Sequence, residues 1–173
     1  MTTLKKEVAM KIGVLSDSHN DFENLKKAIA IINESRVDLL IHCGDVTSID
    51  MLHFMSEYPV ILSFGNGDFI TGELRNTLKE FNVNNFADYS YQGVFGEKQI
   101  GVTHGHIQKL YDDMVLSQKL DYLFTGHTHR RKDDRIGKTR IINPGALGGM
   151  YYQSRSICIL DPDTDELIFK KIG

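Results

Sequence analysis

Short apolar runs alternate with amphipathic stretches through the first half of the chain. Each apolar run ends in polar residues, which is typical of buried strands, and the stretches between them have apolar positions at helical spacing. Asn20 or Asp21 is placed to cap the first helix. This alternation predicts parallel strands with helical crossovers. The expected elements are strand 10–17, helix 22–34, strand 37–45, helix 49–57, strand 59–64 and helix 72–81.

The pattern changes after this point to short strands with turns rich in glycine, proline and aspartate. Helical spacing persists only near 109–119, and the charged run at 129–135 is interpreted as a solvated hairpin. The segment DPDTDE at 161–166 is interpreted as a hairpin turn, because it lacks the full spacing of a calcium loop. Two packed sheets with helices outside would accommodate this α/β pattern. The expected strands are 89–96, 98–106, 121–129, 139–145, 155–163 and 166–172.

Length and composition favour a globular chain with one domain. We expect a single domain over residues 1–173, with 1–9 as a peripheral N-terminal extension. The 173 residues carry a net charge of −3, which gives no reason to expect binding to bulk nucleic acid or to a membrane surface. Cys43 and Cys158 form no CxxC pair, and no run has the length of a signal-peptide core or a membrane span. A cytoplasmic location is therefore expected.

Five predicted strands end in clusters rich in Asp, Asn, His and Gly. In open α/β sheets, ligands bind outside the carboxyl ends of the strands, so these clusters are expected to share one site. Carboxylate, imidazole and amide donors without thiolate suit manganese, iron or zinc. The clusters lie at 16–20, 43–46, 64–68, 103–106 and 125–129.

Several donors in these clusters are spaced two residues apart. Alternate residues of an extended chain point to the same side, so Asp17 is expected to converge with His19, and His127 with His129. Neighbouring glycines let the backbone approach an ion, and Asn20 is expected in a left-handed turn.

In chain order, the motifs D-x-H, G-D, G-N, H and G-H-x-H resemble the signature of calcineurin-like metallophosphoesterases. The forms SDSH, GNGD, THGH, GHTH and NPGA are similar to those of small YfcE-type phosphodiesterases, and the resemblance covers about residues 10–160. It implies a four-layer αββα sandwich, with two mixed β-sheets flanked by helices, and a dinuclear metal site. The residues implied for the first metal are Asp17, His19, Asp45 and His129. Those implied for the second are Asp45, Asn66, His104 and His127.

The resemblance implies a metal-dependent phosphoesterase that acts on a small phosphate ester, with phosphodiesterase activity preferred. Two divalent ions are expected, with Mn²⁺ favoured over Zn²⁺, Fe²⁺ or Ni²⁺. Their charge exceeds that of Asp17 and Asp45, which leaves a centre suited to an anionic phosphate. The expected reaction is attack on phosphorus by a hydroxide that bridges the metals. Asp45 and Asn66 are also candidate catalytic residues.

The sequence departs from the family at Gly67. The broader family often has histidine there, and YfcE-type members commonly have cysteine, so the general acid is left open. His106 is the nearest candidate, as a general acid or as a substrate-positioning residue. His42 is interpreted as a core histidine, or as one that supports the ligands from behind, rather than as a metal ligand. Asp68 either orients a metal-ligating histidine or caps a turn, and the loop at 142–147 either approaches the site through its amides or is a packing turn.

Two other functions fit the same fold. One is a phosphomonoesterase, and the other is a non-catalytic scaffold similar to the retromer subunit, to which the resemblance also extends. All seven ligand positions hold competent donors, which favours the enzyme. A dinucleotide-binding domain is excluded because GVLSDSHN lacks the glycine fingerprint. The resemblance is compatible with a homo-oligomer.

Overall fold

The computed structural model describes residues 10–173, so the expected extension at 1–9 lies outside the described residues. Its first sheet has six strands in the order β11-β10-β1-β2-β3-β4, in which β1 to β4 are parallel and β10 and β11 are antiparallel additions. The strands of this sheet are β1 (Ile12–Leu15), β2 (Leu39–His42), β3 (Val60–Ser63), β4 (Phe86–Asp88), β10 (Ser156–Asp161) and β11 (Glu166–Lys171). The helices that connect its parallel strands are α1 (Phe22–Ser35), α2 (Ile49–His53) and α3 (Thr71–Phe81).

The second sheet has five strands in the order β5-β6-β7-β9-β8. Its central strands β6, β7 and β9 are parallel, and β5 and β8 pair antiparallel at the two edges. The helix α4 (Gln108–Leu116) connects β6 to β7. The strands of this sheet are β5 (Ser90–Phe95), β6 (Lys98–Thr103), β7 (Tyr122–Phe124), β8 (Arg131–Ile136) and β9 (Thr139–Pro144).

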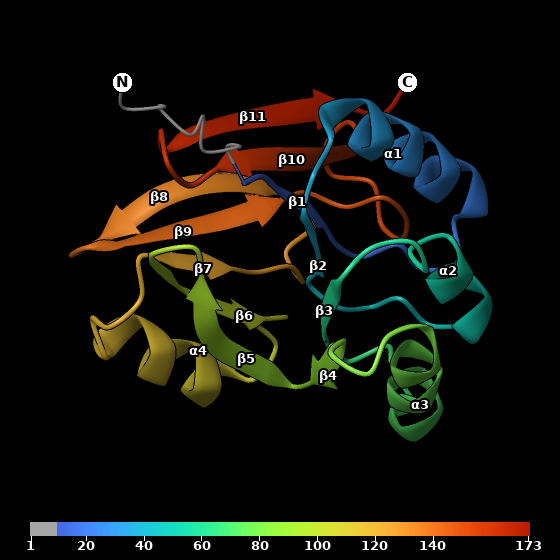
Figure 1. Ribbon diagram of the computed structural model, residues 1–173, viewed down its shortest axis with the longest axis horizontal. Coiled ribbons are helices and arrows are strands. Elements are labelled where there is room, and N and C mark those ends of the chain that lie inside the picture. The colour runs from blue at the N-terminus through green and yellow to red at the C-terminus, as the bar shows by residue number, and fades with distance from the viewer. Residues whose placement is uncertain (1–9) are drawn as a thin grey trace, which may run out of the picture.

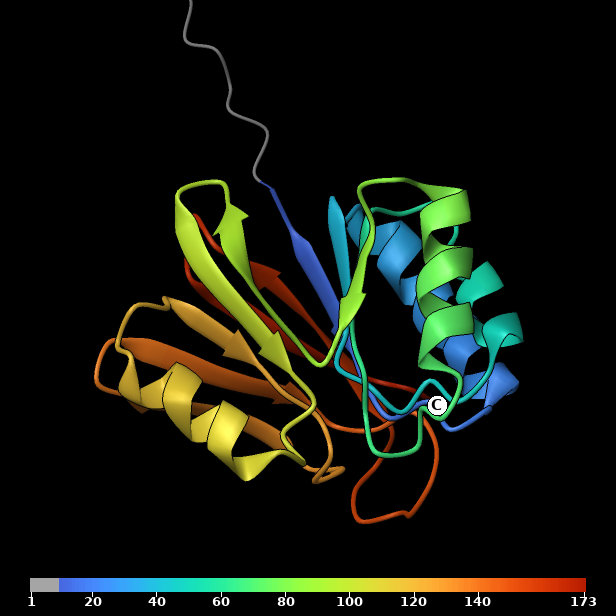
Figure 2. The same ribbon diagram turned by 90° about the horizontal axis from the view of Figure 1, so that it is seen from below.

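The two sheets and four helices form four layers (Figures 1 and 2). One apolar cluster lies between α1–α3 and the first sheet, a second lies between the sheets, and a third lies between α4 and the second sheet. Strand β1 is buried on both faces, so Leu15 packs in the first cluster and its neighbour Val14 in the second. This arrangement confirms the expected αββα sandwich.

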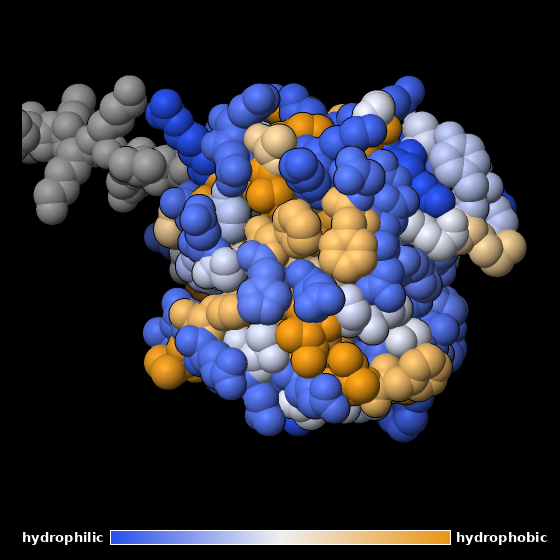
Figure 3. Space-filling view, turned by 90° about the vertical axis from the view of Figure 1, so that its right-hand side faces the viewer, coloured by the Kyte–Doolittle hydropathy of each residue, from blue (hydrophilic) through white to orange (hydrophobic). Residues whose placement is uncertain are grey.

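The ends of α1 follow the local sequence. Asp21 caps the helix by accepting a hydrogen bond from the backbone N–H of Asn24, and Arg36 ends it in a left-handed conformation. Leu25, Ala28 and Ile32 are buried at helical spacing against the first sheet. The outer face of α1–α3 is mostly hydrophilic, with apolar side chains gathered toward its middle (Figure 3). None of the helices within residues 10–173 is long and apolar enough to cross a membrane.

The structure adds two strands, β4 and β8, to the strands expected from the sequence. β4 has only three residues, and β8 carries charged side chains because it is an edge strand with an exposed surface. The run at 129–135 does enter a hairpin, since β8 pairs antiparallel with β9. The turn at 161–166 also joins an antiparallel pair, β10 and β11, so both hairpin predictions are confirmed.

Candidate metal centre

The five polar clusters of the sequence follow the carboxyl ends of β1, β2, β3, β6 and β7. The Nε2 atom of His129 lies 3.2 Å from Asp17 Oδ1, and the Nε2 atom of His104 lies 3.5 Å from Asp45 Oδ2. These two contacts join loops of different sheets. The structure therefore brings together side chains that are far apart in the chain, such as Asp17 and His129.

One group of donors consists of Asp17, His19 and His129, whose ligand atoms all lie within 4.8 Å of one another. The Nε2 atoms of His19 and His129 are 3.3 Å apart. His19 Nε2 is also 3.4 Å from Asp45 Oδ2 and 3.9 Å from Asp17 Oδ1. These are the four residues predicted for the first metal.

A second group consists of Asp17, Asp45 and His104, within the same limit of 4.8 Å. Asn66 lies beside it, with its Oδ1 atom 3.2 Å from His104 Nε2. The His127 ring lies 5.1 Å from the His104 ring, measured between centroids. The four residues predicted for the second metal are thus adjacent. Asp17 belongs to both groups, and Asp45 Oδ2 faces histidines of both.

The tautomers of two histidines follow from their outer hydrogen bonds. His104 Nδ1 is 2.7 Å from the Cys43 carbonyl oxygen, and His129 Nδ1 is 2.9 Å from the Met150 carbonyl oxygen. A carbonyl only accepts, so Nδ1 carries the proton in each ring and Nε2 presents its lone pair inward. An outer bond of this kind is what orients histidines that ligate metals.

The inward-facing atoms fit a divalent cation. Asp17 Oδ1 is buried and has no hydrogen-bond partner within residues 10–173. The Nε2 lone pair of His104 faces carboxylate and amide oxygens, which are acceptors as well. Acceptors that face one another repel unless a cation lies between them, and an unpaired buried polar atom is costly. The donor set of oxygen and imidazole nitrogen suits manganese, iron or zinc.

The backbone explains how these donors converge, and it corrects one expectation. The residues are not on extended chain, because β1 ends at Leu15 and β7 at Phe124, before the donors begin. They lie instead in left-handed turns, which non-glycine residues rarely adopt and which are concentrated at functional sites. Asn20 has a φ of 59°, as expected. The predicted ligands with positive φ are Asp17 at 51°, His19 at 44°, Asp45 at 57°, His127 at 68° and His129 at 56°.

Two glycines allow the loops to approach this closely. A Cβ atom on Gly65 would lie 2.1 Å from Asp45 Oδ1, and one on Gly126 would lie 2.1 Å from Ser16 Oγ and 2.9 Å from Asp17 Oδ2. All three distances are below van der Waals contact. Any larger residue at these positions would displace a predicted metal ligand.

Asp68 and the 142–147 loop both support the backbone of the site. Asp68 accepts hydrogen bonds from backbone N–H groups, including that of Thr47 at 2.8 Å, so the structure favours the cap over the partner of a histidine. The backbone N–H groups of Leu147 and Gly148 donate to the carbonyls of Ser16 and Asp17. These two amides hold the β1 loop in place.

The electrostatic field of the centre favours cations. Burial opposes ionisation of Asp45, but the hydrogen bond and charge of His104, with the Gly67 N–H at 2.6 Å, hold the pKa of Asp45 well below its usual range. Burial likewise lowers the pKa of His104, and the carboxylates of Asp45 and Asp17 outweigh it and raise that pKa overall. A field that favours a proton here also favours a metal cation.

His42 and His106, which are not among the predicted ligands, lie in different environments. The Gly44 N–H donates to His42 Nδ1 at 3.1 Å, so Nε2 carries the proton toward Ser18 Oγ, 2.9 Å away. His42 is fully buried, and burial lowers its pKa to about 4, so it is a neutral histidine that supports the loop after β1 through Ser18. His106 lies beside the centre, with its ring 5.3 Å from that of His104, and its buried Nδ1 atom has no hydrogen-bond partner within residues 10–173.

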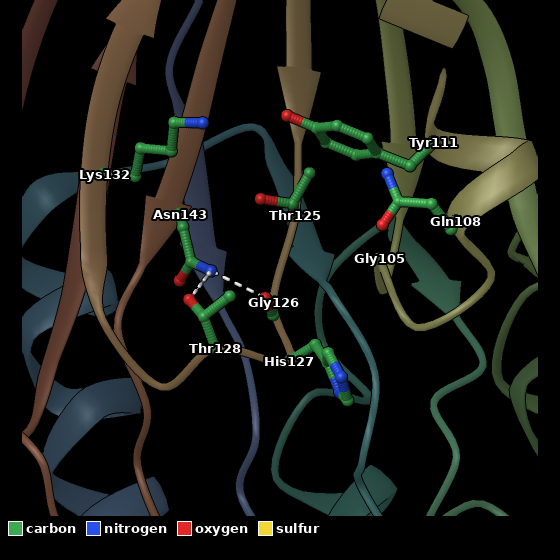
Figure 4. Close-up of a pocket in the computed structure, with 9 residues that line it drawn as sticks. All are labelled: Gly105, Gln108, Tyr111, Thr125, Gly126, His127, Thr128, Lys132 and Asn143. Carbon is green, nitrogen blue, oxygen red and sulfur yellow. Dashed lines mark hydrogen bonds between the residues drawn. The ribbon is translucent and has the colours of Figure 1, made fainter. Parts of the chain in front are cut away.

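A pocket of about 200 Å³ opens beside His127, and the sequence did not predict it (Figure 4). Asn143 fixes its floor, because its Nδ2 atom donates to the Gly126 carbonyl at 2.7 Å and to Thr128 Oγ1 at 3.2 Å. Five lining residues belong to the polar clusters after β6 and β7, and the other four lie on α4, β8 and β9, outside those clusters. The lining residues are Gly105, Gln108, Tyr111, Thr125, Gly126, His127, Thr128, Lys132 and Asn143.

Comparisons with known proteins agree with this geometry. The model of the calcineurin-like phosphoesterase superfamily domain matches residues 10–165. Phosphodiesterase MJ0936 of Methanocaldococcus jannaschii is 33% identical over 159 residues, which cover 91% of this chain and 96% of that protein. A solved archaeal phosphodiesterase is 32% identical, with a TM-score of 0.88 over 94% of this chain and 99% of that one. The phosphoesterase YfcE from E. coli, at 19% identity, shares the fold, with a TM-score of 0.67 over 95% of this chain and 100% of that one.

Proposed function

Since the chain belongs to the calcineurin-like phosphoesterase superfamily, we propose that it is a metal-dependent phosphodiesterase that hydrolyses a small phosphate diester. The observation that carries this proposal is the pair of donor groups built on Asp17 and Asp45. The similarity to phosphodiesterase MJ0936, over nearly the full length of both chains, favours a diester over a monoester.

The same seven residues are proposed to hold two divalent ions. When bound, two such ions supply water activation at neutral pH and stabilise charge on the attacking and leaving oxygens. Asp45, whose Oδ2 atom faces histidines of both groups, is proposed as the shared ligand. Manganese as the metal, a cytoplasmic location, a single domain and a homo-oligomer stay predictions.

The chain's own residues prepare the centre for an anion. The carbonyl partners of His104 and His129 hold both rings in the tautomer that turns Nε2 inward, so no reorientation is needed when a ligand binds. Asn66 presents an amide group beside His104, where it would contact a phosphate oxygen or a metal. Asp45 is held ionised by its hydrogen bonds, which preserves its negative charge through the reaction.

His106 is the one residue proposed as a source of the proton that the departing alcohol needs. Gly67 offers no side chain, and its N–H is already donated to Asp45 Oδ1. His106 lies beside His104 and has an unpartnered Nδ1 atom, so it is proposed either to protonate the leaving oxygen or to position the phosphate. General acid help is typically worth about 10²–10⁴-fold in rate.

The test compares bis(p-nitrophenyl) phosphate with p-nitrophenyl phosphate, using protein reconstituted with Mn²⁺ after chelation. The proposal expects diester hydrolysis that depends on added metal and exceeds monoester hydrolysis. Asp45→Asn should lose most of this activity, whereas Asp163→Asn, in the exposed β10–β11 turn, should keep it. A protein that binds no metal and hydrolyses neither compound would be a scaffold, and the proposal would be wrong.

A further inference from the structure

The pocket beside His127 contains a cation without a partner. Lys132, on β8, is half-buried, and within residues 10–173 its ammonium group makes no hydrogen bond or ion pair. Lys132 pairs with Asn143 in the β8–β9 register, so its side chain lies over the pocket floor. Figure 4 shows Lys132 on one side of the pocket and Tyr111 on the other, with His127 at one end.

The other cations of this hairpin are all engaged. Arg131 donates to the Ser154 carbonyl at 2.8 Å, Arg140 donates to Asp133 at 2.8 and 2.9 Å, and Arg135 pairs with Asp165. Lys138 lies 3.9 Å from Asp121. Lys132 therefore differs from its neighbours in having a charge that the described protein leaves available to a ligand.

The rest of the pocket is polar without being acidic. Among residues 10–173, no aspartate or glutamate lines it, and Lys132 is the only lining residue with an ammonium or guanidinium group. The Tyr111 hydroxyl makes no hydrogen bond within residues 10–173, and Thr125 Oγ1 has only a long one of 3.5 Å. A ligand in this space would meet one positive charge and hydroxyl groups, which suits an anion bearing further oxygen atoms.

Size and position restrict what this ligand can be. The volume of about 200 Å³ is below the roughly 300–1,000 Å³ of pockets that hold whole drug-sized ligands. His127 lines the pocket and also lies beside His104, so a molecule at the metal centre would extend one substituent into this space. The pocket therefore fits a small part of a substrate whose phosphate lies at the centre.

We propose that this pocket binds the ester arm that stays attached to phosphorus, and that the arm is small and carries a second negative charge recognised by Lys132. This rests on the proposed phosphodiesterase function. Gly67 has no side chain to serve as an acid and His106 is the one proposed proton source, so an arm whose alcohol has a low pKa leaves most readily. Recognition of the substrate is therefore assigned to the retained arm. The substrate class is a phosphate diester with a carboxylated or phosphorylated short arm.

The experiment uses p-nitrophenyl diesters that share one leaving group and differ in the retained arm. The arms are ethyl, 2-carboxyethyl and 2-phosphonoethyl, assayed with the Mn²⁺-loaded protein. Wild type should show a kcat/KM roughly tenfold higher for at least one anionic arm than for ethyl, since a hydrogen bond to a charged group is worth about that factor. The arm with the larger preference identifies carboxylate or phosphate as the natural anion.

Three variants assign this preference to Lys132. Lys132→Gln should bring the ratio of anionic to ethyl arms close to one, and Lys132→Arg should retain most of it. Lys138→Gln, in the same hairpin but outside the pocket, should leave every rate unchanged. If wild type cleaves the ethyl diester but shows no preference, or if Lys132→Gln keeps the preference, the proposal is overturned. If wild type cleaves none of the three diesters, the phosphodiesterase function fails and this proposal falls with it.

Discussion

The carboxylate of Asp68 accepts a hydrogen bond from the backbone N–H of Asp45 at 2.9 Å. The same Oδ2 atom accepts the N–H of Gly65 at 2.8 Å, and Oδ1 accepts the N–H of Thr47. One buried side chain thereby ties the loop after β2 to the loop after β3. The left-handed turn that presents Asp45 to the centre depends on this connection.

Replacing Asp68 should cost both stability and metal affinity. Asp68→Ala leaves these backbone donors without their acceptor, and we expect a loss of about 3 kcal/mol in the free energy of unfolding, because buried hydrogen bonds to charged groups are worth ~1.5–3 kcal/mol. Urea denaturation measures this loss, and titration with Mn²⁺ measures the affinity. Asp68→Asn keeps one acceptor oxygen, so its stability and its Mn²⁺ affinity should lie between those of wild type and Asp68→Ala. Equal stability of wild type and Asp68→Ala would contradict this role.

Gly65 and Gly72 offer a matched pair of glycine substitutions. Gly65→Ala would place a Cβ atom 2.1 Å from Asp45 Oδ1, so we expect disrupted metal binding and a loss of activity of at least tenfold. Gly72 lies in the first turn of α3 with open space around it, and Gly72→Ala should stabilise the protein by about 0.5–1 kcal/mol. Thermal unfolding and Mn²⁺-dependent activity test both. Similar behaviour of the two variants would show that the close approach at Gly65 is unimportant.

His42 should make the stability of the protein depend on pH. Burial lowers its pKa from 6.5 to about 4 in the folded chain, so below pH 6.5 the unfolded state binds a proton that the folded state does not. Stability from this group is fully present above pH 6.5 and is lost as the pH falls toward 4, by about 3 kcal/mol in total.

The variant His42→Gln isolates this contribution, because an amide can accept from Gly44 and donate to Ser18 without titrating. Free energies of unfolding are measured for both proteins in the presence of a chelator at several pH values from 7 to 4. We expect wild type to lose more stability than His42→Gln across this range. Parallel curves would mean that His42 is not the buried neutral group that its contacts indicate.

Much of the fold follows from local sequence, because apolar spacing marks the strands and helices that face a core. Asp21 caps α1 as its position predicts, and the polar clusters lie at strand ends, where parallel topology brings them together. β4 escaped prediction because three residues are too few to form a pattern, and β8 was predicted only as part of a hairpin because its charged side chains lack an apolar pattern.

For the candidate site, the sequence indicates which residues are donors but not the backbone geometry that presents them. Its donors are recognisable as residue types in motifs, but the left-handed turns at Asp17 and His127 depend on contacts between loops. The expectation of extended chain was wrong for this reason. Lys132 escaped notice because its sequence neighbours are all charged, and only the hydrogen bonds and ion pairs of the folded hairpin show that, within residues 10–173, it is the one cation of the hairpin without a partner.

The identity of the leaving group should control the rate strongly. With no acid at Gly67, wild-type activity on aryl diesters should fall as the pKa of the leaving phenol rises, and most steeply if His106 does not act as an acid. A plot of rate against that pKa with a slope near zero would contradict this prediction. His106→Gln separates its two proposed roles, since loss of an acid steepens the slope and loss of a positioning group lowers all rates alike.

The central claim is that seven side chains from five loops hold two metal ions. Crystals of the protein soaked in Mn²⁺ and measured by anomalous diffraction test it most directly. We predict two anomalous peaks on either side of the Asp45 carboxylate, one beside His19 and His129 and the other beside His104 and His127. No peak among these side chains, or a single peak that contacts only one group, would contradict the account.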